Sequence, residues 1–127
     1  MKHEIQILDG SDGPELPIVE GGGLARAVVW PGTGARSRSL HHIWLEPEAQ
    51  TIELNHPSDA VYYVIEGAGA VIDQSAGESH ELDLGAMFHV DGGTSYLVCA
   101  GDSGMELVGG PAPADDSLYL HISNPKD

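Results

Sequence analysis

The apolar segments of this chain are short, and turn-forming residues separate them throughout. Seventeen glycines and eight prolines interrupt the 127 residues, and the apolar runs recur at the spacing of about 8–12 residues that is typical of β-sandwiches and barrels. The runs cover residues 24–30, 39–45, 50–54, 61–65, 68–72, 81–84, 87–90, 94–100, 105–108 and 118–122, and a further short strand is expected at 4–8. No stretch carries the long i, i+3, i+4, i+7 apolar stripe of an amphipathic helix. The sequence therefore predicts an all-β fold with little helix.

One domain accounts for the whole length. A chain of 127 residues is long enough to bury one hydrophobic core and too short for two. Hydrophobic residues make up 41% and charged residues 20%, a balance typical of globular rather than disordered chains. We expect a single domain over residues 1–127, with an N-terminal strand and polar lead-in over 1–23 and the barrel over 24–127.

The charge balance is strongly acidic. Twenty Asp and Glu residues stand against five Lys and Arg, for a net charge of −15, so phosphate backbones and anionic lipid surfaces are repelled. We expect no nucleic-acid partner and no membrane partner. The N-terminus has no secretory apolar segment, and no apolar run reaches membrane-spanning length, which favours a cytoplasmic location. The single cysteine, Cys99, excludes an internal disulfide and a CxxC metal site.

The segment Tyr62-Tyr63-Val64-Ile65-Glu66-Gly67 resembles the YVLEG strand and turn of the cupin superfamily. Counted back from Gly67, the first cupin motif, G-x5-H-x-H-x3–4-E-x6-G, falls on residues 48–67, where His56 and Gly67 match it and Glu48, Leu54 and Ala60 replace its opening Gly, first His and Glu. Pro47 stands where many cupins carry Pro-Gly. Gly85 and Gly93 match the glycines of the second motif, G-x5-P-x-G-x2-H-x3-N. The resemblance covers residues 47–100 in detail, and the rest of the chain resembles the family only in the spacing of its expected strands. It implies a cupin-type antiparallel β-barrel, also called a double-stranded β-helix or jelly roll.

The resemblance also locates the residues that hold a metal ion in other cupins. There, three histidines and one glutamate converge on iron, manganese, nickel, zinc or copper, which imidazole and carboxylate ligands suit. The corresponding positions of this chain are Leu54, His56, Ala60 and Tyr96. One neutral imidazole does not hold a divalent ion against water. We therefore expect no metal at the usual cupin position and no cofactor.

Alternation along the strands predicts which side chains line the barrel lumen. The residues expected there are Leu54, His56, Tyr62, Val64, Tyr96 and Val98. We expect a small molecule to bind between His56 and Tyr96, the candidate catalytic residues, with Leu54 and Val98 as apolar wall. Imidazole titrates near neutral pH, so His56 suits a general acid or base; alternatively, it is a hydrogen-bonded remnant of the metal site. The Tyr96 phenol donates a hydrogen bond to a ligand or, alternatively, serves only in packing.

Further residues extend this candidate site. His41 shares its face with Ile43 and Leu45, which directs it into the barrel and makes it a candidate ligand-binding residue. Arg36 and Arg38 lie close to it in sequence and suit recruitment of a carboxylate or phosphate at the mouth; the alternative is ion pairing with the abundant acids. A non-standard metal site is also open. Its candidate ligands are His41, His89, His121 and Glu53, with His56.

Three functions follow from this sequence. The first is binding of a small organic molecule in the lumen, with a metal-independent isomerisation, cyclisation or lyase step. The second is a metal-dependent oxygenase or isomerase with a shifted ligand set, and the third is a non-catalytic binding or sensor module. Cupins commonly pair through an outer sheet, so the resemblance implies a homodimer, for which Trp30, Trp44 and the N-terminal strand supply apolar surface.

Overall fold

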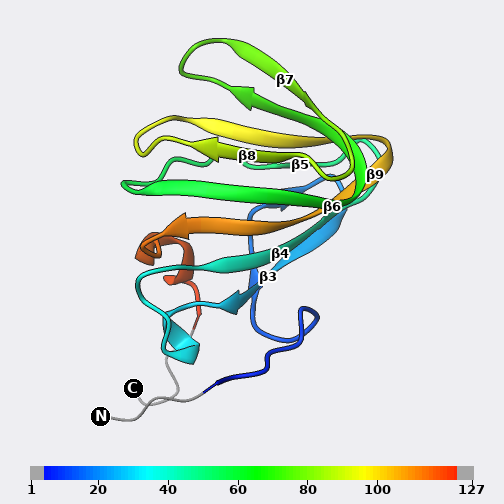
Figure 1. Ribbon diagram of the computed structural model, residues 1–127. Helices are drawn as coiled ribbons and strands as arrows, with labels where there is room; N and C mark the ends of the chain where they lie inside the picture. The colour runs from blue at the N-terminus through cyan, green and yellow to red at the C-terminus, as the bar shows by residue number, and fades with distance from the viewer. Residues whose placement is uncertain (1–4, 123–127) are drawn as a thin grey trace.

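The computed structural model describes residues 5–122 and shows an antiparallel β-barrel (Figure 1). The strands in this range are β1 (Glu15–Leu16), β2 (Val19–Glu20), β3 (Gly23–Val29), β4 (Leu40–Leu45), β5 (Gln50–Thr51), β6 (Asp59–Asp73), β7 (Glu78–Leu82), β8 (Met87–Val90) and β9 (Tyr96–Ala112). Two short 3₁₀-helices, η1 (Pro31–Thr33) and η2 (Asp116–Tyr119), complete the secondary structure. Within residues 5–122, no helix has the length and apolar character needed to cross a membrane. The predicted all-β barrel is confirmed.

The two longest strands, β6 and β9, pair with each other along most of their length and form the central ribbon of the barrel. Shifts of register between Val64 and Glu66, and between Gly67 and Gly69, interrupt this pairing and bend the ribbon, as β-bulges do. Gly67 has a φ of 76°, and a Cβ atom there would collide with the carbonyl oxygen of Gly104. Glycine is needed at this bend because it tolerates both the backbone angle and the close approach.

The bend allows each long strand to serve two layers (Figure 1). In one layer β6 pairs with β8, and β9 pairs with β4, which continues to β3 and β1. In the other layer β6 pairs with β7, and β9 pairs with β5, which continues to β2. One side of the barrel is closed by the chain itself, because β1 of the first layer is followed directly in sequence by β2 of the second layer. On the other side β7 and β8 each pair with β6 and not with one another, so this side stays open.

Strand alternation fills the space between the layers. On β4, residues His41, Ile43 and Leu45 are fully buried, as the sequence pattern predicts. On β6, Tyr62 and Val64 point inward, again as predicted. The remaining large core side chains come from β9, from β1 and the residues between β1 and β2, and from the segment before β6: Tyr96, Val98, Met105 and Leu107, with Leu16, Ile18 and Leu54.

Several expectations about individual segments are wrong. The strand expected at 4–8 does not form in its described part, residues 5–8. The run 118–122 belongs to η2 and the turn after it. The runs at 61–65 and 68–72 join into β6, and those at 94–100 and 105–108 join into β9, because pairing between the two long strands carries them through the bend. Gly67, which the resemblance to the YVLEG strand and turn places in a turn, therefore lies in a bulge, whereas Gly93 lies in a turn.

Candidate functional site

Four polar side chains form a buried hydrogen-bond chain in the barrel lumen. Asp115 Oδ2 lies 2.8 Å from His56 Nδ1, and His56 Nε2 lies 2.8 Å from the Tyr96 hydroxyl. The Tyr96 hydroxyl in turn lies 2.7 Å from the hydroxyl of Tyr62. All four residues are 6% exposed or less. The order Asp115–His56–Tyr96–Tyr62 is called the lumen chain below.

The protonation of Asp115 sets the direction of donation along the lumen chain. Burial pushes the pKa of Asp115 upward, but hydrogen bonds from His56 and Ser117 outweigh burial and hold this pKa below its usual value. The ionised carboxylate accepts the proton of His56 Nδ1. With that proton on Nδ1, His56 can accept from the Tyr96 hydroxyl through Nε2, and the Tyr96 oxygen can in turn accept from Tyr62.

Both phenols stay protonated at neutral pH. Burial raises the pKa of Tyr62 to about 12. Burial, together with the nearby Tyr62, also raises the pKa of Tyr96 well above its usual range. A free phenolate is therefore disfavoured at either position.

Backbone pairing places His56 and Tyr96 side by side. Leu54 and Tyr96 exchange two backbone hydrogen bonds, with N···O distances of 2.7 and 2.9 Å. His56 follows two residues after Leu54, and its carbonyl accepts from Gly93 N at 2.7 Å, so both chain segments next to the imidazole are held. Tyr62 reaches the same space from β6.

Asp115 arrives from the segment that follows β9. It caps the N-terminus of η2, where Oδ1 accepts from Ser117 N at 3.1 Å and from Ser117 Oγ at 2.8 Å. One carboxylate oxygen thus fixes the local turn while the other binds His56. Such a cap orients the carboxylate before it meets the imidazole.

A second buried histidine lies beside the lumen chain. His41 Nε2 lies 2.7 Å from the hydroxyl of Tyr119, which also belongs to η2. The ring of Trp30 packs on Tyr119, with ring centroids 5.0 Å apart. Burial lowers the pKa of His41 to about 4, and the neighbouring His56 acts in the same direction, so His41 is neutral at pH 7. The segment around η2 therefore supplies a polar partner to each of the two lumen histidines.

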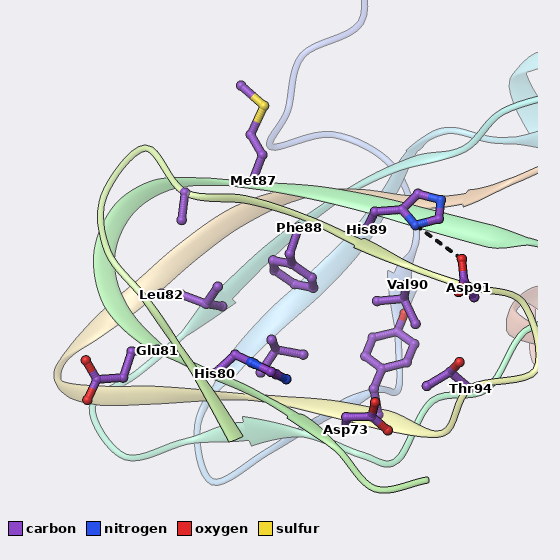
Figure 2. A pocket seen from close by; sticks show the side chains of 13 residues that line it. Asp73, His80, Glu81, Leu82, Met87, Phe88, His89, Val90, Asp91 and Thr94 are labelled. Atoms are coloured by element: carbon purple, nitrogen blue, oxygen red, sulfur yellow. Dashed lines mark ion pairs between the residues drawn. The ribbon is translucent and has the colours of Figure 1, made fainter. Parts of the chain in front are cut away.

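A pocket of about 470 Å³ opens between β7 and β8, on the open side of the barrel (Figure 2). Its described lining residues are Val71, Asp73, His80, Glu81, Leu82, Ala86, Met87, Phe88, His89, Val90, Asp91, Thr94 and Tyr96. Leu82, Phe88 and Val90 reach into the space between the strands, whereas Met87 and His89 project from the opposite side of β8 (Figure 2). An apolar interior with a few polar groups is the usual composition of a small-molecule site. This space is called the β7–β8 pocket below.

The usual cupin metal ligands are not reproduced in the lumen. Leu54 and Ala60 offer no donor atom, and the Tyr96 hydroxyl is hydrogen-bonded to His56 and Tyr62. Both ring nitrogens of His56 are already hydrogen-bonded, to Asp115 and Tyr96. The residues at this position therefore do not fit a divalent ion.

The candidate residues for a non-standard metal site do not come together. His121 Nε2 lies 2.8 Å from the carbonyl of Glu15, and Glu53 is exposed. His89 instead lies near two carboxylates, Asp59 at 3.3 Å and Asp91 at 3.5 Å. Over residues 5–122, this exposed group is the one cluster whose ligand atoms lie close enough together to hold an ion. It is separate from His56.

The structure brings together part of the predicted ligand site. His56, Tyr96 and Tyr62 are joined in the lumen chain, and His41 lies beside it. Leu54, Val64 and Val98 are buried around them. The expected ligand position between His56 and Tyr96 stays a prediction, and in this structure the two side chains contact each other directly at 2.8 Å. Tyr96 also lines the β7–β8 pocket.

Arg36 and Arg38 do not contribute to that pocket. Both are exposed, and neither lines the β7–β8 pocket or pairs with an acid within residues 5–122. The backbone carbonyl of Arg36 accepts from Ala114 N at 3.1 Å, which places it near Asp115 instead. Recruitment of an anion by these arginines stays a prediction.

Sequence reasoning missed Asp115 and the inward face of β8. Asp115 is 59 residues from His56, and its only local signal is an Asp followed two residues later by Ser117, the pattern of a turn cap. Phe88 and Val90 alternate with polar or exposed neighbours, so the strand period alone could have identified them as inward-facing.

Comparison with solved structures supports the fold. The polyketide cyclase RemF from Streptomyces resistomycificus matches with a TM-score of 0.71 and 18% identity, over 88% of this chain and 81% of that chain. A cupin-like protein from Thermotoga maritima matches with a TM-score of 0.67 and 18% identity, over 84% and 79% of the respective chains. A salicylate 1,2-dioxygenase from Pseudaminobacter salicylatoxidans matches with a TM-score of 0.60 and 28% identity, over 69% of this chain but 25% of that chain.

No protein-family model and no curated protein sequence matches the chain. The structural likeness agrees with the motif framework around Gly67, Gly85 and Gly93. The chain thus has the fold of the cupin superfamily.

Proposed function

We propose that this protein binds a small, mostly apolar organic molecule in the β7–β8 pocket and moves a proton on it without a metal ion. The reaction class is an isomerisation, a cyclisation or a lyase step. One observation carries this proposal: Tyr96 lines the pocket and is also the central link of the lumen chain.

The pocket suits such a ligand in size and composition. Its volume of about 470 Å³ lies in the range of small-molecule sites. Leu82, Phe88 and Val90 form an apolar interior, and burial of a ligand against them is favourable by about 25 cal/mol per Å² of apolar surface. Tyr96 and Thr94 are the lining residues that carry hydroxyl groups.

The lumen chain suits a proton relay. When a ligand gives a proton to the Tyr96 oxygen, Tyr96 passes its own proton to His56 Nε2. The resulting imidazolium lies 2.8 Å from the Asp115 carboxylate, which stabilises the positive charge. Concerted transfer avoids a free phenolate, which the raised pKa of Tyr96 disfavours. Return of the proton to another atom of the ligand would complete an isomerisation.

The structural neighbours are compatible with this chemistry. RemF is named a polyketide cyclase and another neighbour a salicylate dioxygenase, so barrels of this shape act on small organic molecules in other proteins. At 18% identity the likeness to RemF extends to the fold alone. A metal-dependent reaction at the usual cupin position is not proposed, because Leu54, Ala60 and the fully engaged His56 do not fit an ion.

A non-catalytic binding module is the second candidate. It is favoured by the saturation of the lumen chain, in which each polar atom already has a partner within the protein. In this case Tyr96 forms a rigid pocket wall, and the ligand is bound without reaction.

A fragment screen by ¹H–¹⁵N nuclear magnetic resonance tests the proposal. We expect hits to shift the amide resonances of Phe88, Val90 and Tyr96. Hits that perturb only residues away from β7 and β8 would refute binding in this pocket. With a reactive ligand in hand, Tyr96→Phe is expected to retain binding and lose about 10²-fold or more in rate, whereas Tyr63→Phe, on an exposed site of β6, retains both. Unchanged turnover in Tyr96→Phe would favour another catalytic group.

We also propose that the protein forms a homodimer through the outer face of β4, β6 and β8. Large apolar side chains are exposed there: Leu40, Trp44, Val61, Tyr63, Ile65 and Met87. The strands that carry them are neighbours across β9, and Tyr63 pairs directly with Met87. Exposed apolar side chains gathered on neighbouring strands in this way are typical of an interface. We favour a second copy of the chain as the partner on this face. The net charge of −15 opposes contact between two copies through most of the surface. On this face, however, the carboxylate of Glu106 is paired with His42 at 2.6 Å.

A further inference from the structure

The polar groups of the β7–β8 pocket are divided between its interior and its edges. On β7, His80 and Leu82 point to the interior, whereas Glu81 points to the opposite side of the strand (Figure 2). On β8, His89 likewise lies on the outer side, where it pairs with Asp59 and Asp91. The acids at the edges are thus paired or directed away from the interior.

Asp73 is the carboxylate that belongs to the interior. It lies at the end of β6, two residues after the buried Val71, so both share the inward face. Its direct partner on β9 is Tyr96, the residue that links the pocket to the lumen chain. Asp73 is half-buried, and its Oδ1 accepts from Ala76 N at 3.0 Å. Over residues 5–122, its Oδ2 forms no ion pair.

No Lys or Arg side chain balances this carboxylate inside the pocket, and the two lining histidines lie near other acids: His80 near Glu78, and His89 near Asp59 and Asp91. None of the described lining residues is Lys or Arg. Arg26 pairs with Glu15 on β1, and Arg36 lies near Ala114. A half-buried carboxylate next to an apolar wall is stabilised by a cation that brings its own hydrogen-bond donors.

The apolar part of the pocket is equally suited to a cation. Phe88 and Tyr96 line it, and aromatic faces attract ammonium groups. The net charge of −15 raises the local concentration of cations around the protein. Volume, aromatic lining and the interior carboxylate therefore favour the same kind of ligand.

We propose that the β7–β8 pocket selects organic cations: molecules with an apolar body and one basic nitrogen, whose charged end pairs with Asp73 while the body lies against Leu82, Phe88 and Val90. This inference rests on the proposed function, because it concerns the same pocket. It departs from the sequence-based expectation of a carboxylated ligand recruited by Arg36 and Arg38.

Three probes with the same body and different charge test the proposal: phenethylamine, 2-phenylethanol and 3-phenylpropionate. Their dissociation constants are measured by nuclear magnetic resonance titration at pH 7 and low salt, in the presence of a chelator that removes metal ions. We expect phenethylamine to bind about tenfold more tightly than 2-phenylethanol, and 3-phenylpropionate to bind most weakly. All three probes should shift Phe88 and Val90.

A matched pair of variants assigns the preference to Asp73. Asp73→Asn removes the charge and keeps an oxygen that accepts from Ala76 N, and it should abolish the preference for the amine. Asp83→Asn removes the same charge at an exposed position in the turn between β7 and β8 that does not line the pocket, and it should leave the preference intact. Equal loss in both variants would refute the role of Asp73 and leave only a general charge effect.

A measurement on the natural protein tests the same proposal without any variant, so it remains valid if a variant fails to fold. Saturating phenethylamine should lower the pKa of the Asp73 carboxyl, measured by carbon NMR, while 2-phenylethanol should not. Equal affinity for the three probes, or an unmoved Asp73, would overturn the selection of cations and leave the pocket as a binding site. Absence of any pocket shift with all three probes would overturn the proposed function itself.

Discussion

His56 donates its Nδ1 proton to the carboxylate of Asp115, 2.8 Å away, although 59 residues separate the two in sequence. The bond fixes which nitrogen of the imidazole carries the proton, and it thereby turns Nε2 into an acceptor for Tyr96. Asp115 is held from its other side by Ser117. The relationship therefore sets the order of donation along the whole lumen chain.

Substitution of Asp115 tests this relationship. We expect Asp115→Asn to destabilise the fold by about 1.5–3 kcal/mol at pH 7, because hydrogen bonds to a charged group are lost. Asp116→Asn, at the exposed neighbouring position, should change stability by less than about 0.5 kcal/mol. Urea unfolding of both variants measures the difference. Equal effects in the two variants would contradict the assigned role of Asp115.

The contribution of Asp115 should also depend on pH. Its pKa in the folded protein is lowered, because hydrogen bonds from His56 and Ser117 outweigh burial. A lowered carboxyl pKa stabilises the fold above the unfolded-state pKa of about 4, and this stabilisation is lost as the pH falls through the folded-state value. The difference in stability between the natural protein and Asp115→Asn should therefore narrow below about pH 4. A constant difference from pH 7 to pH 3 would argue against an ionised Asp115.

His41 should make the stability of the fold depend on pH in a range above that of Asp115. Burial, aided by His56, lowers its pKa to about 4 from the ordinary value of 6.5. Between these two values the unfolded chain binds a proton that the folded protein does not, so stability falls as the pH drops from about 6.5 to 4, by up to about 3 kcal/mol. His41→Gln should flatten the curve in this window. His80→Gln, at an exposed position, is the control and should leave it unchanged.

Removal of the Tyr96 hydroxyl should destabilise the lumen. Tyr96→Phe leaves Tyr62 without an acceptor and His56 Nε2 without a donor, both in buried positions, which costs about 1–3 kcal/mol. Tyr63→Phe removes a hydroxyl from a side chain that is 41% exposed and should change stability by less than about 0.5 kcal/mol. Chemical denaturation compares the two. A neutral Tyr96→Phe would show that the chain is not a stabilising network.

The proposed homodimer is tested by sedimentation velocity at micromolar concentration. We expect a dimer for the natural protein and a 13.4 kDa monomer for Val61→Glu, because a charge would be buried at the centre of the apolar face. Leu120→Glu introduces the same charge at an exposed position after η2 and should remain dimeric. A monomeric natural protein would refute the proposal. Trp30 is not part of this face, because its ring packs on Tyr119.

Periodicity in the sequence determined the barrel and much of its interior. Alternation of apolar and polar residues has a period of two in a strand, so it places Tyr62, Val64 and His41 inside without knowledge of their partners. The framework around Gly67 and Gly93 likewise follows from local backbone requirements. The sequence alone also shows that Leu54, Ala60 and Tyr96 replace three of the four usual cupin metal ligands.

Only the tertiary structure decided how these parts combine. Register between β6 and β9 joins four expected strands into two and opens the barrel between β7 and β8, and register between distant segments leaves no signal in one sequence. Asp115 follows β9 at the N-cap of η2, where side-chain direction depends on the local turn rather than on the strand period. Asp73 keeps the inward parity of β6, but its pairing with Tyr96 is set by the register between β6 and β9. The partner of His56 and the charged group of the pocket were therefore set by packing between segments far apart in the chain.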